Sequence, residues 1–248
     1  MTNLSVNVNK IAWLRNARNG DIPNLKQLCE VILGSGSSGI TVHPRPDLRH
    51  ITPKDVKDLA TLTNKYSKEL NIEGNPFSKK SSTYDGFIEL IKIIKPTQCT
   101  LVPDMDNQIT SDHGWDLTDD TSYLEECIDV IKGLGCRVSL FLDPQINQIE
   151  KAKKIGADRV ELYTGPYAKA YELDNLNNRV LEDYKRACKR AIELELDVNA
   201  GHDLNLKNLK KFLTINEISE VSIGQALISD ALIYGLENTI KKYLSLCE

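Results

Sequence analysis

The chain of 248 residues is 41% hydrophobic and 27% charged, which is the composition of a globular protein with enough apolar material for one substantial core. Its formal net charge is -4 and it has no long basic run, so we expect neither nucleic acid nor an anionic membrane as its main partner. No stretch approaches the roughly 18 apolar residues of a membrane-spanning helix, and the N-terminus does not resemble an export signal, so we expect a cytoplasmic protein.

Short apolar runs rich in Val, Ile and Leu alternate with longer segments of helical periodicity. This alternation is typical of βα units repeated around a parallel sheet. The predicted strands are Leu4–Val8, Gly39–Val42, Leu70–Ile72, Gln98–Val102, Arg137–Leu142, Arg159–Leu162, Asp197–Asn199 and Glu220–Ile223. The predicted helices, one after each strand, are Leu25–Leu33, Pro53–Tyr66, Thr83–Ile94, Tyr123–Leu134, Ile146–Ile155, Asn178–Leu194, Leu206–Phe212 and Ala226–Leu246.

Local signals support two of these helices. Thr52 offers a capping hydroxyl ahead of Pro53, and Asp55 follows three residues after Thr52, so a helix is expected to begin there. In the last segment, apolar residues recur every three or four positions, which predicts one helix lying on the barrel wall. No linker rich in Pro, Gly or Ser divides the chain. Eight uninterrupted units therefore predict a closed (β/α)8 TIM barrel, one domain over residues 1–248, rather than an open doubly wound sheet.

Six cysteines are scattered through the chain without a Cys-x-x-Cys pair. Most lie in apolar stretches, where cysteine packs as a small hydrophobic side chain. We therefore expect reduced, structural cysteines, and neither a zinc site nor a disulfide framework.

The active site of such a barrel lies at the carboxyl ends of its strands. There the segment Gly39–His50 runs from an apolar strand into two imidazoles and two guanidiniums, those of His43, Arg45, Arg49 and His50. Guanidinium groups bind phosphate through paired hydrogen bonds, so this cluster predicts an anion site, with phosphate as the natural ligand.

Polar residues follow the other strands as well. They are Asn7, Asn9, Lys10, Glu73, Asp104, Thr110, Glu161, His202, Asp203, Gly224 and Gln225. A lone histidine is more often structural than catalytic, but His43 and His202 end different strands, which favours a shared site. Glu73 lies where a strand is buried, and a buried carboxyl group with a raised pKa is suited to general-base work.

Several interpretations stay open from the residues alone. Glu161 either belongs to the site or closes an ion pair inside the barrel. Arg15 and Arg18 are solvated loop charges, or at least one of them lies at the rim. Gly224 either merely begins the last helix or presents its backbone N–H and the helix dipole to a phosphate. His113, in the long loop after the fourth strand, is expected to be structural or part of a lid.

No set of Asp and His residues has the spacing of a metal site, and the arginines argue against another fixed cation, so we expect no metal. A lysine that forms a Schiff base would have to lie in a late strand, where none occurs. The chemistry that remains is proton transfer on phosphorylated substrates.

The chain resembles the pyridoxine 5'-phosphate synthase family over nearly its whole length. The segments that carry the resemblance are Val6–Ala12, Leu14–Arg18, Gly39–Arg45, Arg49–Thr52, Asn71–Glu73, Leu101–Pro103, Glu161–Gly165, Val198–His202 and Ser222–Gly224. The resemblance implies a metal-independent homo-octamer without a cofactor. It also implies condensation of 1-deoxy-D-xylulose 5-phosphate with 3-amino-2-oxopropyl phosphate, which gives pyridoxine 5'-phosphate, phosphate and water.

The resemblance further implies a role for each residue of its motifs. His43 and Glu73 would accept protons, and His202 would donate one. Glu161 would stabilise a charged transition state. The residues that would hold the deoxyxylulose phosphate are Arg45, His50 and Thr110. The residues that would border the aminoketone phosphate are Asn7, Arg18, Asp203, Gly224 and Gln225.

The chain departs from many family members at four substrate-binding positions. It has Asn9-Lys10 where they have Asp-His, Asp203 where they have Gly, and Gln225 where they have His. Lys10 can still offer a charge to a phosphate and Gln225 a hydrogen bond, but neither shuttles a proton as an imidazole does. Two rival functions remain: a non-catalytic barrel that binds phosphorylated metabolites, and another sugar-phosphate isomerase or aldolase.

Overall fold

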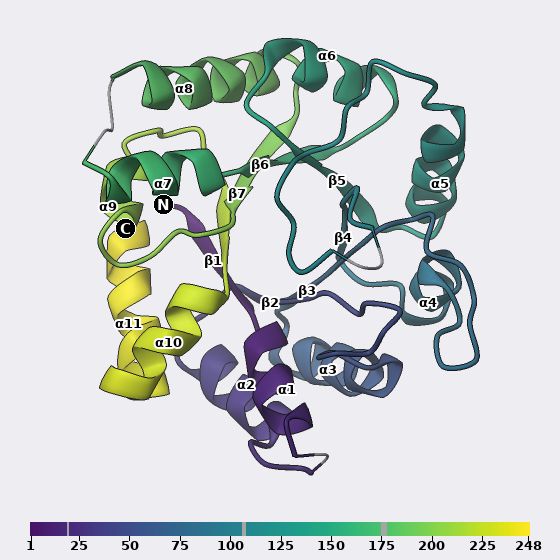
Figure 1. The fold of residues 1–248 in the computed structure, drawn as a ribbon, viewed down its shortest axis with the longest axis vertical. Helices are drawn as coiled ribbons and strands as arrows, with labels where there is room; N and C mark the ends of the chain where they lie inside the picture. Colours follow the sequence, from purple (N-terminus) through teal and green to yellow (C-terminus); the bar gives the residue numbers. More distant parts are fainter. Residues whose placement is uncertain (19, 106–107, 175–177) are drawn as a thin grey trace.

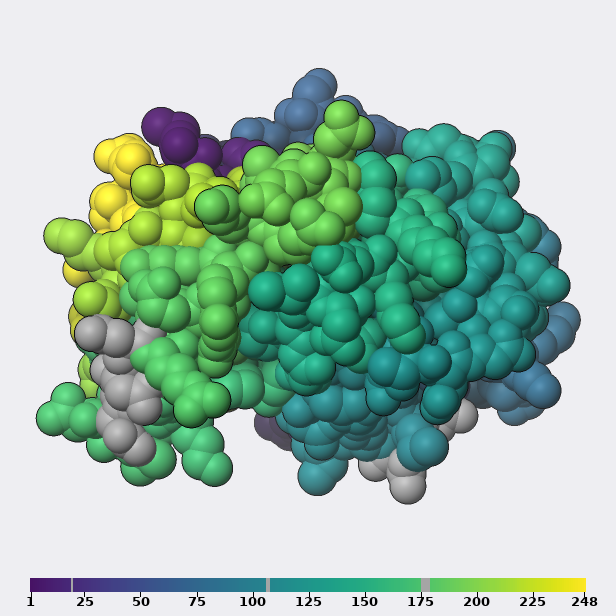
Figure 2. Space-filling view, turned by 90° about the horizontal axis from the view of Figure 1, so that it is seen from above, coloured from purple at the N-terminus to yellow at the C-terminus, as the bar shows by residue number. Residues whose placement is uncertain are grey.

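Eight parallel strands form a closed barrel in the computed structural model, which describes residues 1–18, 20–105, 108–174 and 178–248. Each strand pairs with the next one along the chain, and β8 pairs with β1. Helices surround the barrel in chain order (Figure 1). Figure 2 shows one side of the molecule, where the colours run from yellow through green to teal as this order requires. The predicted (β/α)8 barrel is confirmed.

All eight predicted strands are present, with small changes at their ends. The strands are β1 (Asn3–Asn7), β2 (Gly39–Val42), β3 (Glu69–Gly74), β4 (Gln98–Leu101), β5 (Arg137–Leu142), β6 (Arg159–Tyr163), β7 (Asp197–Gly201) and β8 (Glu220–Ile223). The helices are α1 (Asn9–Asn16), α2 (Leu25–Gly34), α3 (Pro53–Tyr66), α4 (Phe87–Ile94), α5 (Ser122–Gly133), α6 (Ile146–Lys154), α7 (Gly165–Glu172), α8 (Asn178–Glu193), α9 (Leu209–Phe212), α10 (Gln225–Tyr234) and α11 (Leu236–Cys247).

The single helix predicted over Ala226–Leu246 is wrong. Gly235 has a φ of 78° and separates α10 from α11, because this left-handed conformation ends a helix and suits glycine. Leu227 and Ile240 are buried as expected, but Tyr234 is 45% exposed, so the apolar stripe is not continuous. The helix predicted to begin at Leu206 is also shorter, since α9 begins at Leu209.

Two further helices, α1 and α7, were not predicted. Each has eight residues and directly follows a strand. α1 buries only Ile11 and Ala12, so it lacks the repeated apolar spacing by which a helix is recognised in a sequence. Both helices lie beside the carboxyl end of the barrel, and α1 contributes residues to the pocket described below.

The strands alternate between an apolar outer face and a polar barrel interior. Val6, Ile40 and Val160 are completely buried in the core that the strands share with the helices. The intervening polar side chains point into the barrel. Contacts between side chains of strands that are not adjacent in the sheet show this direction. Thr100 Oγ1 lies 3.4 Å from Glu161 Oε2, which joins β4 to β6. This alternation carries a polar interior up to the carboxyl ends of the strands.

The predicted start of α3 is confirmed, and it anchors the segment before it. Thr52 Oγ1 accepts a hydrogen bond from Asp55 N at 3.2 Å, and Asp55 Oδ2 accepts one from Thr52 N at 2.8 Å. Arg15 donates to both carboxylate oxygens of Asp55, at 2.6 and 2.9 Å, and to the His50 carbonyl at 3.2 Å. Arg15 is therefore a structural link between α1, the start of α3 and the backbone of His50.

The six cysteines are buried and free. Their structural role, expected from the sequence, agrees with this burial. Within the described ranges, no helix combines the length and the apolar character that crossing a membrane requires.

Candidate active site

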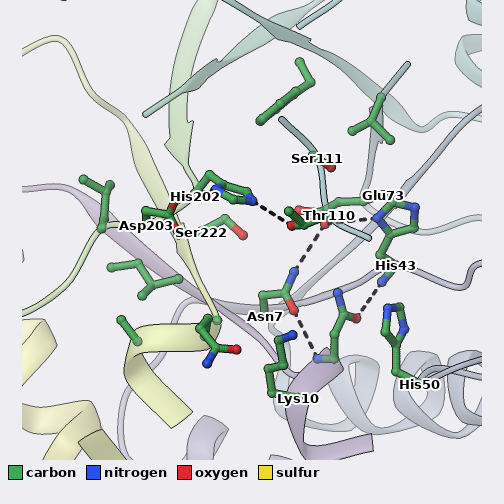
Figure 3. Close-up of a pocket in the computed structure, with 18 of the residues that line it drawn as sticks. Asn7, Lys10, His43, His50, Glu73, Thr110, Ser111, His202, Asp203 and Ser222 are labelled. Atoms are coloured by element: carbon green, nitrogen blue, oxygen red, sulfur yellow. Dashed lines mark hydrogen bonds and ion pairs between the residues drawn. The ribbon is translucent and has the colours of Figure 1, made fainter. Parts of the chain in front are cut away.

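A pocket of about 400 Å³ lies at the carboxyl ends of the strands (Figure 3). Its lining includes every residue to which the family resemblance gives a catalytic or substrate-binding role except Arg18, whereas Arg49 and Asp104 of the polar residues noted in the sequence lie outside it. The residues with such a role that line the pocket are Asn7, Asn9, Lys10, His43, Arg45, His50, Glu73, Thr110, Glu161, His202, Asp203, Gly224 and Gln225. Arg18 is exposed and does not line the pocket of its own chain, so its binding role stays a prediction. His113 also lies outside the lining, where its Nδ1 contacts Asp112 Oδ1 at 2.5 Å.

His43 and Glu73 form one side of the pocket. His43 follows β2 and Glu73 lies in β3, and their Nδ1 and Oε2 atoms are 3.9 Å apart. Asn7 Nδ2 donates to the same Glu73 oxygen at 3.3 Å. Asn9 Oδ1 accepts a hydrogen bond from the backbone N–H of His43 at 2.9 Å, so Asn9 fixes the point where β2 ends.

Burial keeps both groups of this pair neutral. It lowers the pKa of His43 well below its usual value, and the positive charge of Arg45 acts in the same direction. It raises the pKa of Glu73 well above its usual value, and repulsion from the Glu161 carboxylate adds to the effect. The pair therefore offers an unprotonated imidazole nitrogen and a carboxyl group that keeps its proton to a higher pH than usual.

Glu161 lies deeper in the barrel, below the pocket. Burial, with repulsion from Glu220, raises its pKa to about 8, and Thr100 contacts its carboxyl group. A Cβ atom at Gly201 would lie 2.3 Å from Glu161 Oε1, so glycine at the end of β7 makes room for this carboxyl group. Among its described contacts, Glu161 does not form the ion pair that the sequence left open. The ion pair in the barrel interior joins Arg159 to Glu220 instead, with Nη1 and Oε2 3.9 Å apart. Glu161 faces the pocket.

Cationic residues line another side of the pocket. Arg45 is buried and donates to Asp104 and to the carbonyl oxygen of Gln108, the latter at 3.1 Å. His50 is buried next to it, and burial together with the charges of Arg45 and Arg49 lowers the pKa of His50 to about 3. Among the described residues, His50 Nδ1 has no hydrogen-bond partner. This corner therefore holds a fixed guanidinium and an imidazole with a free nitrogen.

Lys10 approaches the pocket from α1. Its Nζ lies 4.2 Å from the ring centre of Trp13, a distance at which an ammonium group is attracted to an aromatic face. Burial, followed by repulsion from Arg49, lowers the pKa of Lys10. Lys10 thus brings a positive charge to the pocket without an ion pair to a carboxylate among its described contacts.

The beginning of α10 provides a second region suited to an anion. Gly224, Gln225 and Ala226 line the pocket at the N-terminus of this ten-residue helix. The first backbone N–H groups of a helix have no partner within the helix, and the helix dipole places partial positive charge there. Gly224 lies at this N-terminus and lines the pocket, and its role in binding a phosphate stays a prediction.

His202 faces the pocket from the end of β7. Its Nε2 lies 2.9 Å from Thr110 Oγ1, and its ring meets the Tyr163 ring edge-on with 5.3 Å between centres. In the view of Figure 3, Thr110 lies between His202 and the pair of His43 and Glu73. Acid–base groups therefore reach the pocket from two directions.

Some pocket residues were not found from the sequence. They include Trp13, Ser111, Phe141, Leu204 and Ser222. Ser222 could have been found, because it precedes Gly224 and alternates with outward-facing apolar residues of β8. Trp13 could not have been assigned to the pocket without predicting α1, the helix that carries it. Among the residues that the structure describes, no three His, Cys, Asp or Glu side chains are grouped in a way that could hold a metal ion.

Comparison with known proteins shows which family this chain is related to. A family model described as "Pyridoxal phosphate biosynthesis protein PdxJ" matches residues 4–248. A pyridoxine 5'-phosphate synthase of Xanthomonas campestris pv. campestris (strain B100) is 49% identical over 246 residues, which cover 99% of this chain and 96% of the relative. The synthase of Christiangramia forsetii is 49% identical over 247 residues and 99% of both chains.

Solved structures show the fold alone. A thiamine phosphate pyrophosphorylase from Pyrococcus furiosus superposes with a TM-score of 0.61 at 12% identity, over 99% of this chain and 95% of the other. A tryptophan synthase structure of Mycobacterium tuberculosis gives 0.65 at 11% identity, over 99% and 92%. The sequence relationship is far closer than these, and it spans the strands, the pocket residues and the last helix. The chain belongs to the PdxJ family of pyridoxal phosphate biosynthesis proteins.

Proposed function

We propose that this chain is a pyridoxine 5'-phosphate synthase. It condenses 1-deoxy-D-xylulose 5-phosphate with 3-amino-2-oxopropyl phosphate and releases pyridoxine 5'-phosphate, inorganic phosphate and water. Identity of 49% to a named synthase over nearly the full length of both chains supports the proposal. The observation that carries it is a single pocket in which acid–base groups stand between two regions suited to phosphate.

Two separate phosphate regions suit a reaction between two anionic substrates. Arg45, His50 and Thr110 bind the deoxyxylulose phosphate on the cationic side. The start of α10, with Gly224 and Gln225, binds the aminoketone phosphate. Because each phosphate is held by hydrogen-bond donors of its own region, the two anionic groups are kept apart while the reacting atoms meet, and binding meets the entropic cost of the bimolecular step.

The reaction moves several protons in both directions. The amine adds to a ketone, water leaves to form an imine, phosphate is eliminated, and the ring closes through a carbon–carbon bond before a second loss of water. Neutral His43 accepts a proton at its free nitrogen. Glu73 first supplies the proton that burial keeps on it, and then becomes an acceptor. His202 donates protons from the other direction.

Glu161 acts on the charge that develops during these steps. With a pKa of about 8, it is mostly protonated at neutral pH in the empty pocket. A positive charge beside it, such as that of a protonated imine, favours its carboxylate form and is stabilised by it. Asn7, Asn9, Lys10 and Asp203 border the substrates around these groups.

The proposal includes a cytoplasmic homo-octamer. Exposed apolar side chains on two adjacent helices support assembly: Leu14 of α1 is 56% exposed, and Leu232 and Ile233 of α10 are 79% and 74% exposed. The six free cysteines suit a reducing compartment. Light scattering after size-exclusion chromatography should give eight times the chain mass, and a monomer or dimer would contradict this part of the proposal.

Turnover separates the proposal from its rivals. Purified protein is incubated with both substrates, and the fluorescence of pyridoxine 5'-phosphate is followed. The wild type should form product, whereas His202→Ala should bind both substrates and form almost none. A wild type that binds both phosphates without forming product would instead support a non-catalytic binding barrel, and conversion of a single sugar phosphate would support an isomerase or aldolase.

A further inference from the structure

Asp203 directs its charge at the histidine that precedes it. Its Oδ2 lies 2.9 Å from His202 Nδ1, while the opposite ring nitrogen, Nε2, lies 2.9 Å from Thr110 Oγ1. A carboxylate only accepts hydrogen bonds, so Nδ1 must carry a proton in this contact. In the neutral ring, Nε2 is then the free nitrogen, and it faces the pocket. The bond from His202 in turn holds the pKa of Asp203 below its usual value.

The backbone of this dipeptide is held in an uncommon conformation. His202 has a φ of 85° and Asp203 a φ of 60°, which residues other than glycine rarely adopt without support. The support comes from neighbouring side chains: Thr164 donates to the His202 carbonyl, and Asn208 Nδ2 donates to the Asp203 carbonyl at 3.1 Å. The conformation turns the Asp203 carboxylate back toward the imidazole.

Other titratable groups surround the pair from neighbouring elements. Tyr163 and Glu161 of β6 lie beside and below it, and Asp112 and Asp143 lie in the loops after β4 and β5. None of them has a described hydrogen bond to the His202 ring, whose described partners are Asp203 and Thr110. Asp203 is thus the one carboxylate among the described contacts that fixes the proton on this ring.

We propose that Asp203 is a positioning residue for His202: it holds the Nδ1 proton and the ring orientation, so that Nε2 is the atom that exchanges protons with the substrate. This inference rests on the proposed function and deepens it. The role corresponds to that of the carboxylate behind a catalytic histidine in hydrolases, which fixes the tautomer and stabilises the imidazolium without touching the substrate. It also explains how a negative charge is accommodated beside a phosphate region, since the charge is paired with the imidazole.

Asp203→Gly tests the inference without straining the backbone, because glycine suits the φ at this position. We expect kcat to fall about tenfold, less than for a fully buried carboxylate because Asp203 is 51% exposed, with KM for both substrates changed by less than about twofold. The shape of the pH–rate profile should change, because no carboxylate then holds the proton on His202 Nδ1. Asp203→Asn, which keeps an acceptor but loses the charge, should change the profile in the same way.

Nitrogen-15 NMR of the histidine rings provides a readout that does not depend on turnover. At a pH where the ring is neutral, wild-type His202 should carry its proton on Nδ1, and Asp203→Gly should show a mixture of both tautomers. Asp112→Asn serves as the matched control, because it removes the charge from a similar Asp–His contact outside the pocket lining. It should leave kcat, the pH profile and the His202 signals unchanged.

A merely structural Asp203 would lower the melting temperature and leave the pH profile and the His202 ring signals as in the wild type. That result, in either Asp203 variant, would overturn the inference. If the wild type forms no pyridoxine 5'-phosphate at all, the proposed function fails, and the NMR comparison still decides whether Asp203 fixes the proton on His202.

Discussion

The Glu73→Gln substitution best distinguishes a catalytic role of Glu73 from a role in packing. Glutamine has nearly the shape of a protonated glutamic acid, and burial already keeps the Glu73 side chain neutral by raising its pKa. The acceptor for Asn7 Nδ2 is retained by the amide oxygen. We therefore expect the free energy of unfolding below about pH 4.5, where Glu73 is mostly protonated in both the folded and the unfolded chain, to change by no more than about 0.5 kcal/mol, which is about 2 °C in melting temperature for a domain of this size.

The effect on turnover should be much larger. Losing a positioned acid–base group costs roughly 100-fold to 10,000-fold in rate, because glutamine can neither release nor take up the proton. We expect kcat to fall at least about 100-fold, which corresponds to about 2.7 kcal/mol in the activation barrier. KM for both substrates should stay within about threefold, since the phosphates bind to other residues.

The same variant should change how stability depends on pH. The pKa of Glu73 is higher in the folded protein than in the unfolded chain, so the neutral side chain stabilises the fold fully below about pH 4.5. This stabilisation is lost as the pH rises through the folded pKa. Glutamine does not titrate, so the melting temperature of the variant relative to the wild type should rise as the pH increases above about 4.5.

Glu69→Gln is the matched control for this experiment. Glu69 begins the same strand that Glu73 nearly ends, and it pairs with Arg137 at the opposite end of the barrel, where its side chain is 42% exposed. It should keep wild-type kcat. A Glu73→Gln enzyme with kcat within about tenfold of the wild type, or one that unfolds at pH 6, would refute the reasoning.

Three further predictions concern other residues of the pocket. Gly201→Ala places a Cβ atom 2.3 Å from Glu161 Oε1 and should lower the free energy of unfolding, measured with urea, by about 1–3 kcal/mol. It should lower kcat by a larger factor, and an unchanged kcat would count against a role for Glu161. The free energy of unfolding of the wild type should fall between pH 4.5 and about 8, because the pKa of Glu161 is higher in the folded protein than in the unfolded chain. Glu161→Gln should flatten this part of the plot of stability against pH, and parallel plots for the two proteins would contradict the raised pKa. His50, with a pKa of about 3, should show no NMR titration between pH 5 and 8 in the empty pocket, and a midpoint near 6.5 would disprove its burial.

The sequence predicted the barrel because its strands are short apolar runs at regular spacing. The rule that the active site lies at the carboxyl ends of the strands then brought His43, Glu73 and His202 together, although they lie in or directly after three different strands. The last helix was predicted incorrectly, because Gly235 lies inside an apolar pattern that continues on both sides of it. Periodicity alone does not show that a glycine ends a helix.

The hydrogen bonds and ion pairs between side chains could not be predicted from the sequence. Arg15 was left open as a loop charge because its link to Asp55 depends on α1, a helix without apolar periodicity. Asp203 was expected to border a phosphate, and only the contact between its carboxylate and His202 Nδ1 in the structure shows that it faces His202. Arg18 carries a motif position of the family, but it is not among the described residues that line the pocket, so its binding role stays a prediction.

The most direct test of the account is the stoichiometry of the complete reaction. Purified protein is supplied with both phosphorylated substrates, and pyridoxine 5'-phosphate and inorganic phosphate are measured together by mass spectrometry and a phosphate assay. The account predicts one phosphate released for each pyridoxine 5'-phosphate formed, and neither product when one substrate is omitted. Phosphate release without pyridoxine 5'-phosphate, or from a single substrate, would contradict the claim that one pocket joins the two.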